Sequence, residues 1–222
     1  MRLYPYLTPT SHTWTSHRTH VRIVEESAER TMTMQNPIAT LTMNTGRKIV
    51  IELRPDAAPN TVNSFIYLAG LGVFDGHAIQ RIVPGFVVDA SYSAFGREEA
   101  KYLIARETRQ AGFPNNIRVE PGVICMGGYV DGLAGGEFFF PLAYHERLDG
   151  AYPAFGIVTE GLDEIRRWET VELVPVTLPE VPKLRVNEPK EPIVIESVTV
   201  ETFGMNYPEP EKLENWTMPA TW

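Results

Sequence analysis

The stretch that decides the fold runs from Gln80 to Asp89 and reads QRIVPGFVVD. Its β-branched and aromatic residues are typical of β-structure, and we expect a β-rich block over Ile79–Val88. Arg81 departs from this apolar character, because an arginine buried without a partner is costly. An arginine in an apolar strand followed by a Pro-Gly pair therefore indicates a functional residue.

Upstream of this stretch the pattern is regular. Two strands are expected, at Ile38–Met43 and Lys48–Leu53, joined by a turn. A helix should follow over residues 59–69, because apolar residues recur there at helical spacing and a proline suits the first helical turn. The side chains of Asn60 and Thr61 are the expected caps.

Downstream, further short strands and a second helix are expected. The strands are Gly122–Met126, Glu137–Leu142, Ala154–Val158 and, with a bulge, Pro192–Phe203, and the helix follows Thr159. Many strands with one helix near each end of the β region predict a mainly β fold. We expect a closed antiparallel β-barrel of about eight strands, with two helices capping its openings.

Three segments are expected to be irregular. Residues 172–192 hold five prolines and predict an extended surface loop rather than a strand. Residues 91–118 predict a solvated rim loop. The glycine pairs 127–128 and 135–136 flank a glycine-rich segment, which predicts a flexible connection.

One domain is expected over residues 35–204. Residues 1–34 are polar and lack apolar periodicity, so they predict a poorly ordered extension, with Met32 or Met34 as the natural start. Residues 205–222 predict an irregular tail. Three histidines in the extension are expected to be solvated and to bind no metal, because nothing there orients them: His12, His17 and His20.

The composition excludes several classes of protein. A formal net charge of −8 argues against a nucleic-acid binder, which needs a basic face. Cys125 is the single cysteine, which excludes an intramolecular disulfide and fits a cytoplasmic location. No apolar run reaches the ~18–20 residues that cross a bilayer, so no membrane partner is expected. The common nucleotide-binding, zinc-protease and serine-hydrolase motifs are absent from the sequence. The sequence carries no clear signal of oligomerisation, so a monomer is expected.

Two stretches together resemble the cyclophilin family. They are QRIVPGFVVD at 80–89, and the pair formed by Gly122–Gly128 (GVICMGG) and Gly136–Phe140 (GEFFF). That family carries an Arg-Ile-x-Pro-Gly-Phe strand, then a Gly-x-x-x-Met strand and a Gln-Phe-Phe strand. Three further pieces agree in order and spacing: Ala58–Phe65, Leu148–Gly156 and Glu160–Leu162. The resemblance covers roughly residues 37–203 and implies a peptidyl-prolyl cis-trans isomerase.

The chemistry of such an enzyme needs no cofactor and no metal. An X-Pro bond isomerises slowly because amide resonance must be broken, a barrier of roughly 18–20 kcal/mol. An apolar slot that grips the proline ring, and a donor aimed at the prolyl amide, lower this barrier if they bind the twisted state more tightly than the planar one. An arginine suits the donor role, because it stays charged and its N–H groups form a rigid fork.

The resemblance assigns these roles to numbered residues. It implies that Arg81 is the donor and that the slot is formed by Phe86, Val87, Phe139 and Leu148. It also implies substrate contacts for Asp89, Gly127, Gly128, Glu137 and Tyr152. Taken without the family, the apolar members of this set are explained equally well as core residues. The expected partners are proline-containing peptides or unfolded protein chains.

The sequence departs from the family at five of its positions. The family usually has glutamine at Asp89 and at Glu137, and asparagine at Gly128; it often has tryptophan at Arg147 and histidine at Tyr152. Two carboxylates beside Arg81 either hold its guanidinium in bidentate pairs or raise the pKa of one acid. Both alternatives predict slower turnover and a pH-dependent rate, and the missing tryptophan predicts weak binding of cyclosporin.

Two other functions follow from the same residues. A proline-peptide binding module that has kept the fold and lost catalysis is the first, and the Asp89 and Glu137 pair is its best support. A glycosidase that uses the two acids as acid and base is the second. It would need a long aromatic cleft, whereas three of the four tryptophans lie near the chain ends.

Overall fold

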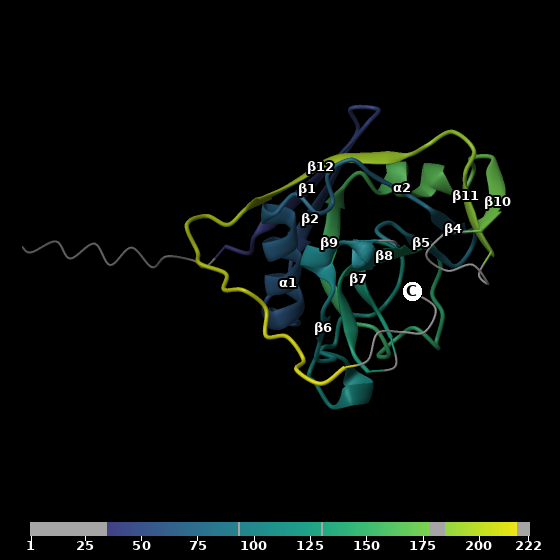
Figure 1. The fold of residues 1–222 in the computed structure, drawn as a ribbon. Helices are drawn as coiled ribbons and strands as arrows, with labels where there is room; N and C mark the ends of the chain where they lie inside the picture. The colour runs from purple at the N-terminus through teal and green to yellow at the C-terminus, as the bar shows by residue number, and fades with distance from the viewer. Residues whose placement is uncertain (1–34, 93, 130, 178–184, 217–222) are drawn as a thin grey trace, which may run out of the picture. The chain divides into compact units, whose positions relative to one another are not determined.

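The computed structural model describes residues 35–92, 94–129, 131–177 and 185–216. The expected N-terminal extension, with its three histidines, lies outside these residues, as does the end of the tail. The described part forms a curled antiparallel sheet with a helix packed against one side of it (Figure 1). No helix in the described part of the chain is both long and apolar enough to cross a membrane.

The first elements match the sequence pattern. Strands β1 (Ile38–Met43) and β2 (Lys48–Leu53) have the predicted bounds and pair as an antiparallel hairpin. Alternate residues of both strands are fully buried, as expected for a sheet with one face on the core. Helix α1 (Pro59–Gly70) follows, also as predicted, and the chain then turns at Gly72 in the left-handed region that glycine favours (φ +68°).

Ten strands form the main sheet. Besides β1 and β2 they are β3 (His77–Ala78), β4 (Arg81–Val83), β5 (Val87–Asp89), β6 (Leu103–Ile104), β7 (Val123–Gly128), β8 (Leu133–Pro141), β9 (Ala154–Glu160) and β12 (Val194–Glu201). Their order is β3-β12-β1-β2-β9-β7-β8-β5-β4, and β6 pairs with β8. The predicted bulge is confirmed in β12, where the pairing with β1 skips Glu196.

The expected mainly β barrel with two helices is confirmed, with one qualification. No ladder joins the edge strands β3 and β4 in the described part of the chain, so the barrel is strongly curled but not strictly closed. These two strands are only two and three residues long, which leaves little backbone to form a closing ladder. Short edge strands of this kind also offer little template for unwanted pairing.

The main core lies between the sheet and α1. Ring centroids of Phe65 lie 5.4 Å from Phe74, 5.6 Å from Phe138 and 5.4 Å from Phe155. Aromatic rings at such distances add stabilisation beyond the area they bury. The second helix, α2 (Leu162–Trp168), contributes Ile165 and Trp168 to this same core. Its fully buried Trp168 is anchored by an indole N–H that donates to Glu164 (2.9 Å).

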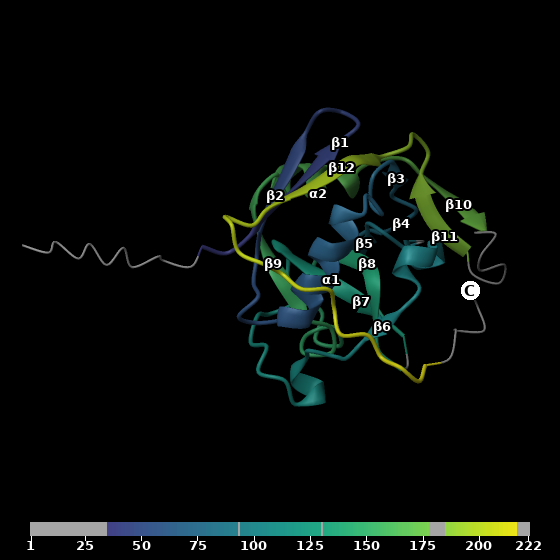
Figure 2. The same cartoon turned by 60° about the vertical axis from the view of Figure 1, so that its left-hand side comes forward.

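The proline-rich segment contradicts the loop prediction. Within residues 172–192, strands β10 (Leu173–Thr177) and β11 (Arg185–Pro189) form a two-stranded antiparallel ladder beside β4 (Figure 2). Pro175 pairs with Asn187 and Leu173 with Pro189. In an isolated two-stranded ladder each strand has an open side, so a proline costs no hydrogen bond where its nitrogen faces outward.

The rim-loop prediction for residues 91–118 is also wrong. The segment contains β6 and three single-turn helices, η1 (Ala94–Gly96), η2 (Glu98–Ala100) and η3 (Arg109–Ala111). Several of its side chains are buried, among them that of Glu107. The Glu107 carboxylate accepts hydrogen bonds from the backbone N–H groups of Asn60 (2.9 Å) and Thr61 (2.7 Å). It therefore caps α1 in place of the Asn60 and Thr61 side chains that we expected.

The two glycine pairs lie within strands. Gly127 and Gly128 lie in β7, and Gly135 and Gly136 lie in β8. At Gly135 a Cβ atom would sit 2.2 Å from the ring of Tyr102, so only glycine allows this close approach. The glycines are strand residues that make room for neighbours.

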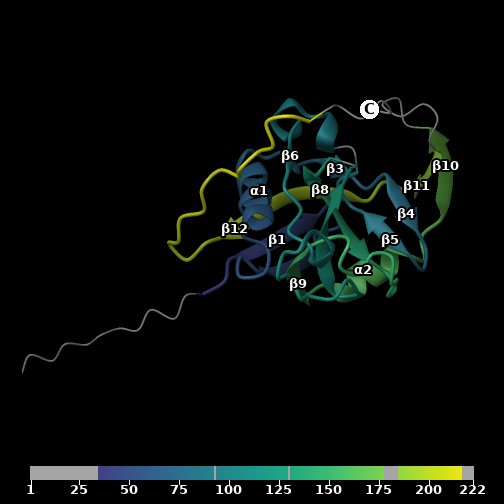
Figure 3. The same ribbon diagram turned by 90° about the horizontal axis from the view of Figure 1, so that it is seen from below.

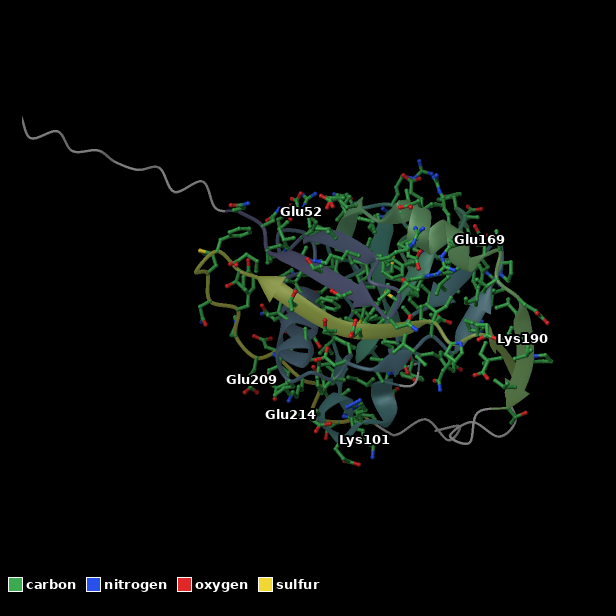
Figure 4. The ribbon with its side chains drawn as sticks, turned by 90° about the horizontal axis from the view of Figure 1, so that it is seen from above. Glu52, Lys101, Glu169, Lys190, Glu209 and Glu214 are labelled. Atoms are coloured by element: carbon green, nitrogen blue, oxygen red, sulfur yellow. The ribbon has the colours of Figure 1, made fainter. Side chains whose placement is uncertain are left out.

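Residues 205–216 have no regular secondary structure, yet they are fastened along α1 to β6 (Figure 3). Asn60 and Glu211 exchange two hydrogen bonds (2.9 and 2.8 Å). The Lys212 ammonium lies 4.6 Å from the ring centroid of Tyr102, and the Leu213 N–H donates to the Leu103 carbonyl (2.8 Å). Glu209 and Glu214 on this segment are exposed (Figure 4).

Candidate active site

The β4–β5 hairpin positions Arg81. Arg81 and Asp89 are direct partners in the ladder, and their side chains form an ion pair between Nη1 and Oδ2. Both side chains are largely shielded, with 27% and 18% exposed. The register of two apolar strands thus places one arginine beside one carboxylate, which provides the partner that its burial requires.

The turn of this hairpin is held from two sides. Gly85 takes a left-handed conformation (φ +69°), and its N–H donates to the carboxylate of Glu169 (2.9 Å), which follows α2 (Figure 4). Nε2 of His145 donates to the Gly85 carbonyl (2.9 Å). These contacts fix the orientation of the next residue, Phe86, at the mouth of the site.

An apolar slot lies beside the hairpin; we use this name for the surface formed by Phe86, Val87, Phe139 and Leu148. Three of the four are at most 6% exposed, and Phe86 is partly buried. Together with Cys125 they belong to a hydrophobic cluster that is separate from the main core. The Phe139 ring meets that of Tyr152 edge-on at 5.5 Å. The slot is therefore built on its own packed base.

A polar floor adjoins the slot; it consists of Arg81, Asp89, Tyr92, Tyr129 and Glu137. Glu137 on β8 is 8% exposed, and Oε1 of its carboxyl accepts a hydrogen bond from the Tyr129 hydroxyl (2.9 Å). Burial raises the pKa of Glu137 well above its usual range, and the negative charge of Asp89 raises it further. The neutral carboxyl form is favoured.

Asp89 has a different balance of forces. Burial raises its pKa as well, but the guanidinium of Arg81 opposes that shift through charge and a hydrogen bond. The same guanidinium lies 5.8 Å from the ring centroid of Tyr92, whose pKa burial also raises. Among the described residues Arg81 forms an ion pair with Asp89 and not with Glu137. The clamp by two carboxylates is thus not formed. The pKa of both acids is raised, and the main cause in each is burial rather than the charge of the other acid.

All ten residues that the sequence singled out line one cavity of about 350 Å³. They are Arg81, Phe86, Val87, Asp89, Gly127, Gly128, Glu137, Phe139, Leu148 and Tyr152. The sequence reasoning missed Tyr92 and Tyr129, although each lies within three residues of a position it named. No cluster of three metal-ligating side chains occurs in the described part of the chain. The roles of these residues toward a substrate stay predictions.

Comparison with known proteins gives a consistent result. The family model described as cyclophilin type peptidyl-prolyl cis-trans isomerase/CLD matches residues 38–200. Peptidyl-prolyl cis-trans isomerase B of Bacillus subtilis is 36% identical over 119 residues, which cover 53% of this chain and 80% of that protein. Peptidyl-prolyl cis-trans isomerase-like 3 of Gibberella zeae is 29% identical over 159 residues, with coverages of 68% and 89%.

The solved structures agree in fold. A cyclophilin type isomerase of Cryptosporidium parvum, crystallised in the presence of the dipeptide Ala-Pro, superimposes with a TM-score of 0.58 at 17% identity. The match covers 74% of this chain and 98% of that one.

Proposed function

The chain belongs to the cyclophilin-type peptidyl-prolyl cis-trans isomerase family, and we propose that it isomerises X-Pro bonds in peptides and unfolded protein chains. The observation that carries this proposal is the position of a shielded arginine beside an apolar slot in the same cavity. The proposal includes a cytoplasmic monomer, which cell fractionation and light scattering would test.

The apolar slot supplies the first part of the chemistry. Phe86, Phe139 and Leu148 present an apolar surface that removes water from the proline ring and its amide. Water favours the planar amide, because that form is the more polar one. A dry slot therefore destabilises the ground state relative to the twisted state, and a packed base keeps its shape.

Arg81 supplies the second part. One N–H group of its guanidinium is used on Asp89, and a guanidinium has five in all. The remaining N–H groups can donate to the prolyl amide nitrogen when that nitrogen leaves conjugation.

Glu137 bears on the expected loss of activity. A neutral carboxyl group presents one O–H donor and one carbonyl acceptor, as a glutamine side chain presents a donor and an acceptor. The raised pKa of Glu137 therefore supports a role close to that of the glutamine usual at this position. Slower turnover then depends on Asp89, which competes with the substrate for Arg81.

A binding module without catalysis is the second candidate, and the Arg81–Asp89 ion pair favours it. If the pair holds the guanidinium too tightly, the slot binds proline peptides and leaves their exchange rate unchanged.

The deciding experiment is exchange NMR on a short Ala-Pro peptide with wild-type protein and Arg81→Ala. We expect wild-type protein to accelerate exchange and Arg81→Ala to lose about 100-fold of that acceleration, typical of removing one transition-state donor. Arg166→Ala, which changes an exposed arginine on α2, is the matched control. Shifted peptide resonances without acceleration would establish the binding module instead.

A further inference from the structure

A second cavity, of about 440 Å³, adjoins the first one and shares Tyr152 with it. Two loops form its walls, one at residues 106–111 and one at residues 147–152. Its lining includes two arginines, Arg106 and Arg147, and no acidic side chain. In a chain with a net charge of −8, a cavity lined by two cations has the opposite sign to the molecule as a whole.

Both arginines are held by neutral groups. The guanidinium carbon of Arg147 lies 4.4 Å from the ring centroid of Phe86, at the edge of the slot. Arg106 donates a hydrogen bond to the carbonyl of Tyr129. No ion pair with either arginine occurs in the described part of the chain, so their positive charges are not neutralised by direct contact.

Two carboxylates that adjoin the lining residues in the sequence are engaged elsewhere. Asp149 accepts from Arg109 (2.7 Å) and from the backbone N–H of Val119 (3.0 Å). Glu107, which follows Arg106 in the chain, turns the other way to cap α1. No acidic side chain lines the cavity, so its two guanidinium groups can take an external anion.

We propose that this cavity binds an acidic side chain of the substrate, an aspartate or glutamate one or two positions from the proline. The proposal rests on the proposed function, since it places that side chain beside an X-Pro bond held in the slot. Neighbouring Cα atoms are 3.8 Å apart, so one or two residues span the distance between adjoining cavities. The rest of the lining consists of the Thr108 and Gln110 side chains, the Tyr152 ring and two alanines.

The test measures peptide affinity by chemical-shift titration. One series of acetylated pentapeptides carries a central proline and a single glutamate, placed in turn at each of the four flanking positions; a matched series carries glutamine. At one position at least, we expect the glutamate peptide to bind about three- to tenfold more tightly at low salt, and less so at high salt. A ratio near one at every position overturns the proposal.

Three variants locate the effect. Arg106→Gln and Arg147→Gln should each lower the ratio of glutamate-peptide to glutamine-peptide affinity. Arg147→Glu should instead make the protein prefer a matched lysine peptide. The matched control is Arg118→Gln, whose guanidinium also lies over an aromatic ring, 4.7 Å from the Tyr144 centroid, but does not line the cavity. If the affinity ratio is unchanged in both Arg106→Gln and Arg147→Gln, the proposal is overturned.

The same samples separate this proposal from the proposed function. Exchange NMR reports isomerase activity, whereas the titration reports affinity alone. Preference for glutamate without acceleration of either peptide would refute the isomerase and support the subsite. If cis-trans exchange is accelerated in both peptides and they bind equally tightly, the isomerase is supported and the subsite is refuted.

Discussion

The two halves of the cavity are built by different means. The apolar slot rests on a packed cluster of its own, so its shape follows from packing. The polar floor has two acids where the family usually has amides. Its electrostatics therefore depend on the protonation of these acids and on their contacts with nearby charges. The comparison teaches that one cavity can combine a slot shaped by packing with a floor governed by electrostatics.

Removal of Phe139 would break the slot and should have the largest effect. Phe139 is 4% exposed, so Phe139→Ala should cost about 3–5 kcal/mol of unfolding free energy and weaken proline-peptide binding. Urea denaturation and peptide titration measure the two effects. Leu71→Ala, at a residue 50% exposed, is the control and should cost far less. A loss below about 1 kcal/mol would show that the slot does not depend on packing.

Cyclosporin binding sharpens the comparison at the rim. Arg147 stands where the family often has a tryptophan, and its guanidinium covers the Phe86 ring. Arg147→Trp should tighten cyclosporin binding about tenfold, since an indole adds apolar contact at the slot. Fluorescence titration measures this affinity, with Arg118→Trp as the control. A wild-type protein that already binds cyclosporin tightly would contradict the prediction.

Asp89 tests whether the polar floor restrains Arg81. Asp89→Gln removes the ion pair and restores the amide usual in the family, so kcat/KM should rise about fivefold, the upper range of a weak ion pair. Asp56→Asn, which breaks a comparable pair with Arg54 far from the cavity, should leave the rate unchanged. A lower rate in Asp89→Gln would instead assign Asp89 the role of orienting Arg81.

The pH dependence that Glu137 causes is the smallest of the expected effects, and its direction follows from the shift in the pKa of this residue. Its pKa is raised in the folded protein, so the folded state holds the proton more strongly than the unfolded state. The stability that this proton contributes is present at acid pH and is lost as the pH rises through the folded pKa. The new carboxylate would face Asp89, Arg81 and the hydroxyls of Tyr92 and Tyr129.

We therefore expect the isomerisation rate to fall about threefold with rising pH, because a second anion on the floor competes for Arg81. Glu137→Gln should make both the rate and the urea midpoint less dependent on pH, and it should be the more stable protein at alkaline pH. Exchange NMR and denaturation between pH 5 and 9 measure both. A wild-type rate that is flat over this range would refute the prediction.

The sequence predicts the parts of this molecule in which local pattern and packing agree. The strict alternation of apolar and polar residues predicted the bounds of β1 and β2. The break in this alternation predicted the bulge of β12. The cavity residues were predictable because they lie in or beside short motifs with a fixed order. The β10–β11 ladder was not, because the rule against proline in strands weakens where a strand has an open side.

The missed residues depend on contacts that a local pattern does not contain. The cap of α1 comes from Glu107, 47 residues beyond the N–H group of Asn60 that it binds. Tyr129 reaches Glu137 because the β7–β8 pairing shifts register between Met126 and Gly128. Such a shift is set by how closely glycine backbones approach their neighbours, which residue periodicity does not encode.

The position of β12 has a consequence for how the chain is made. The last strand of the sheet lies between β1 and β3, and Glu201 pairs with Ile38. During synthesis, at roughly 5–20 residues per second, β1 must wait many seconds with one edge unpaired until β12 emerges. Contacts of such long range also slow folding, since their loop entropy is lost before they form. A member of a family named for isomerising prolyl bonds thus leaves the ribosome with an open sheet edge of its own, and chaperones that shield such edges become relevant to its yield.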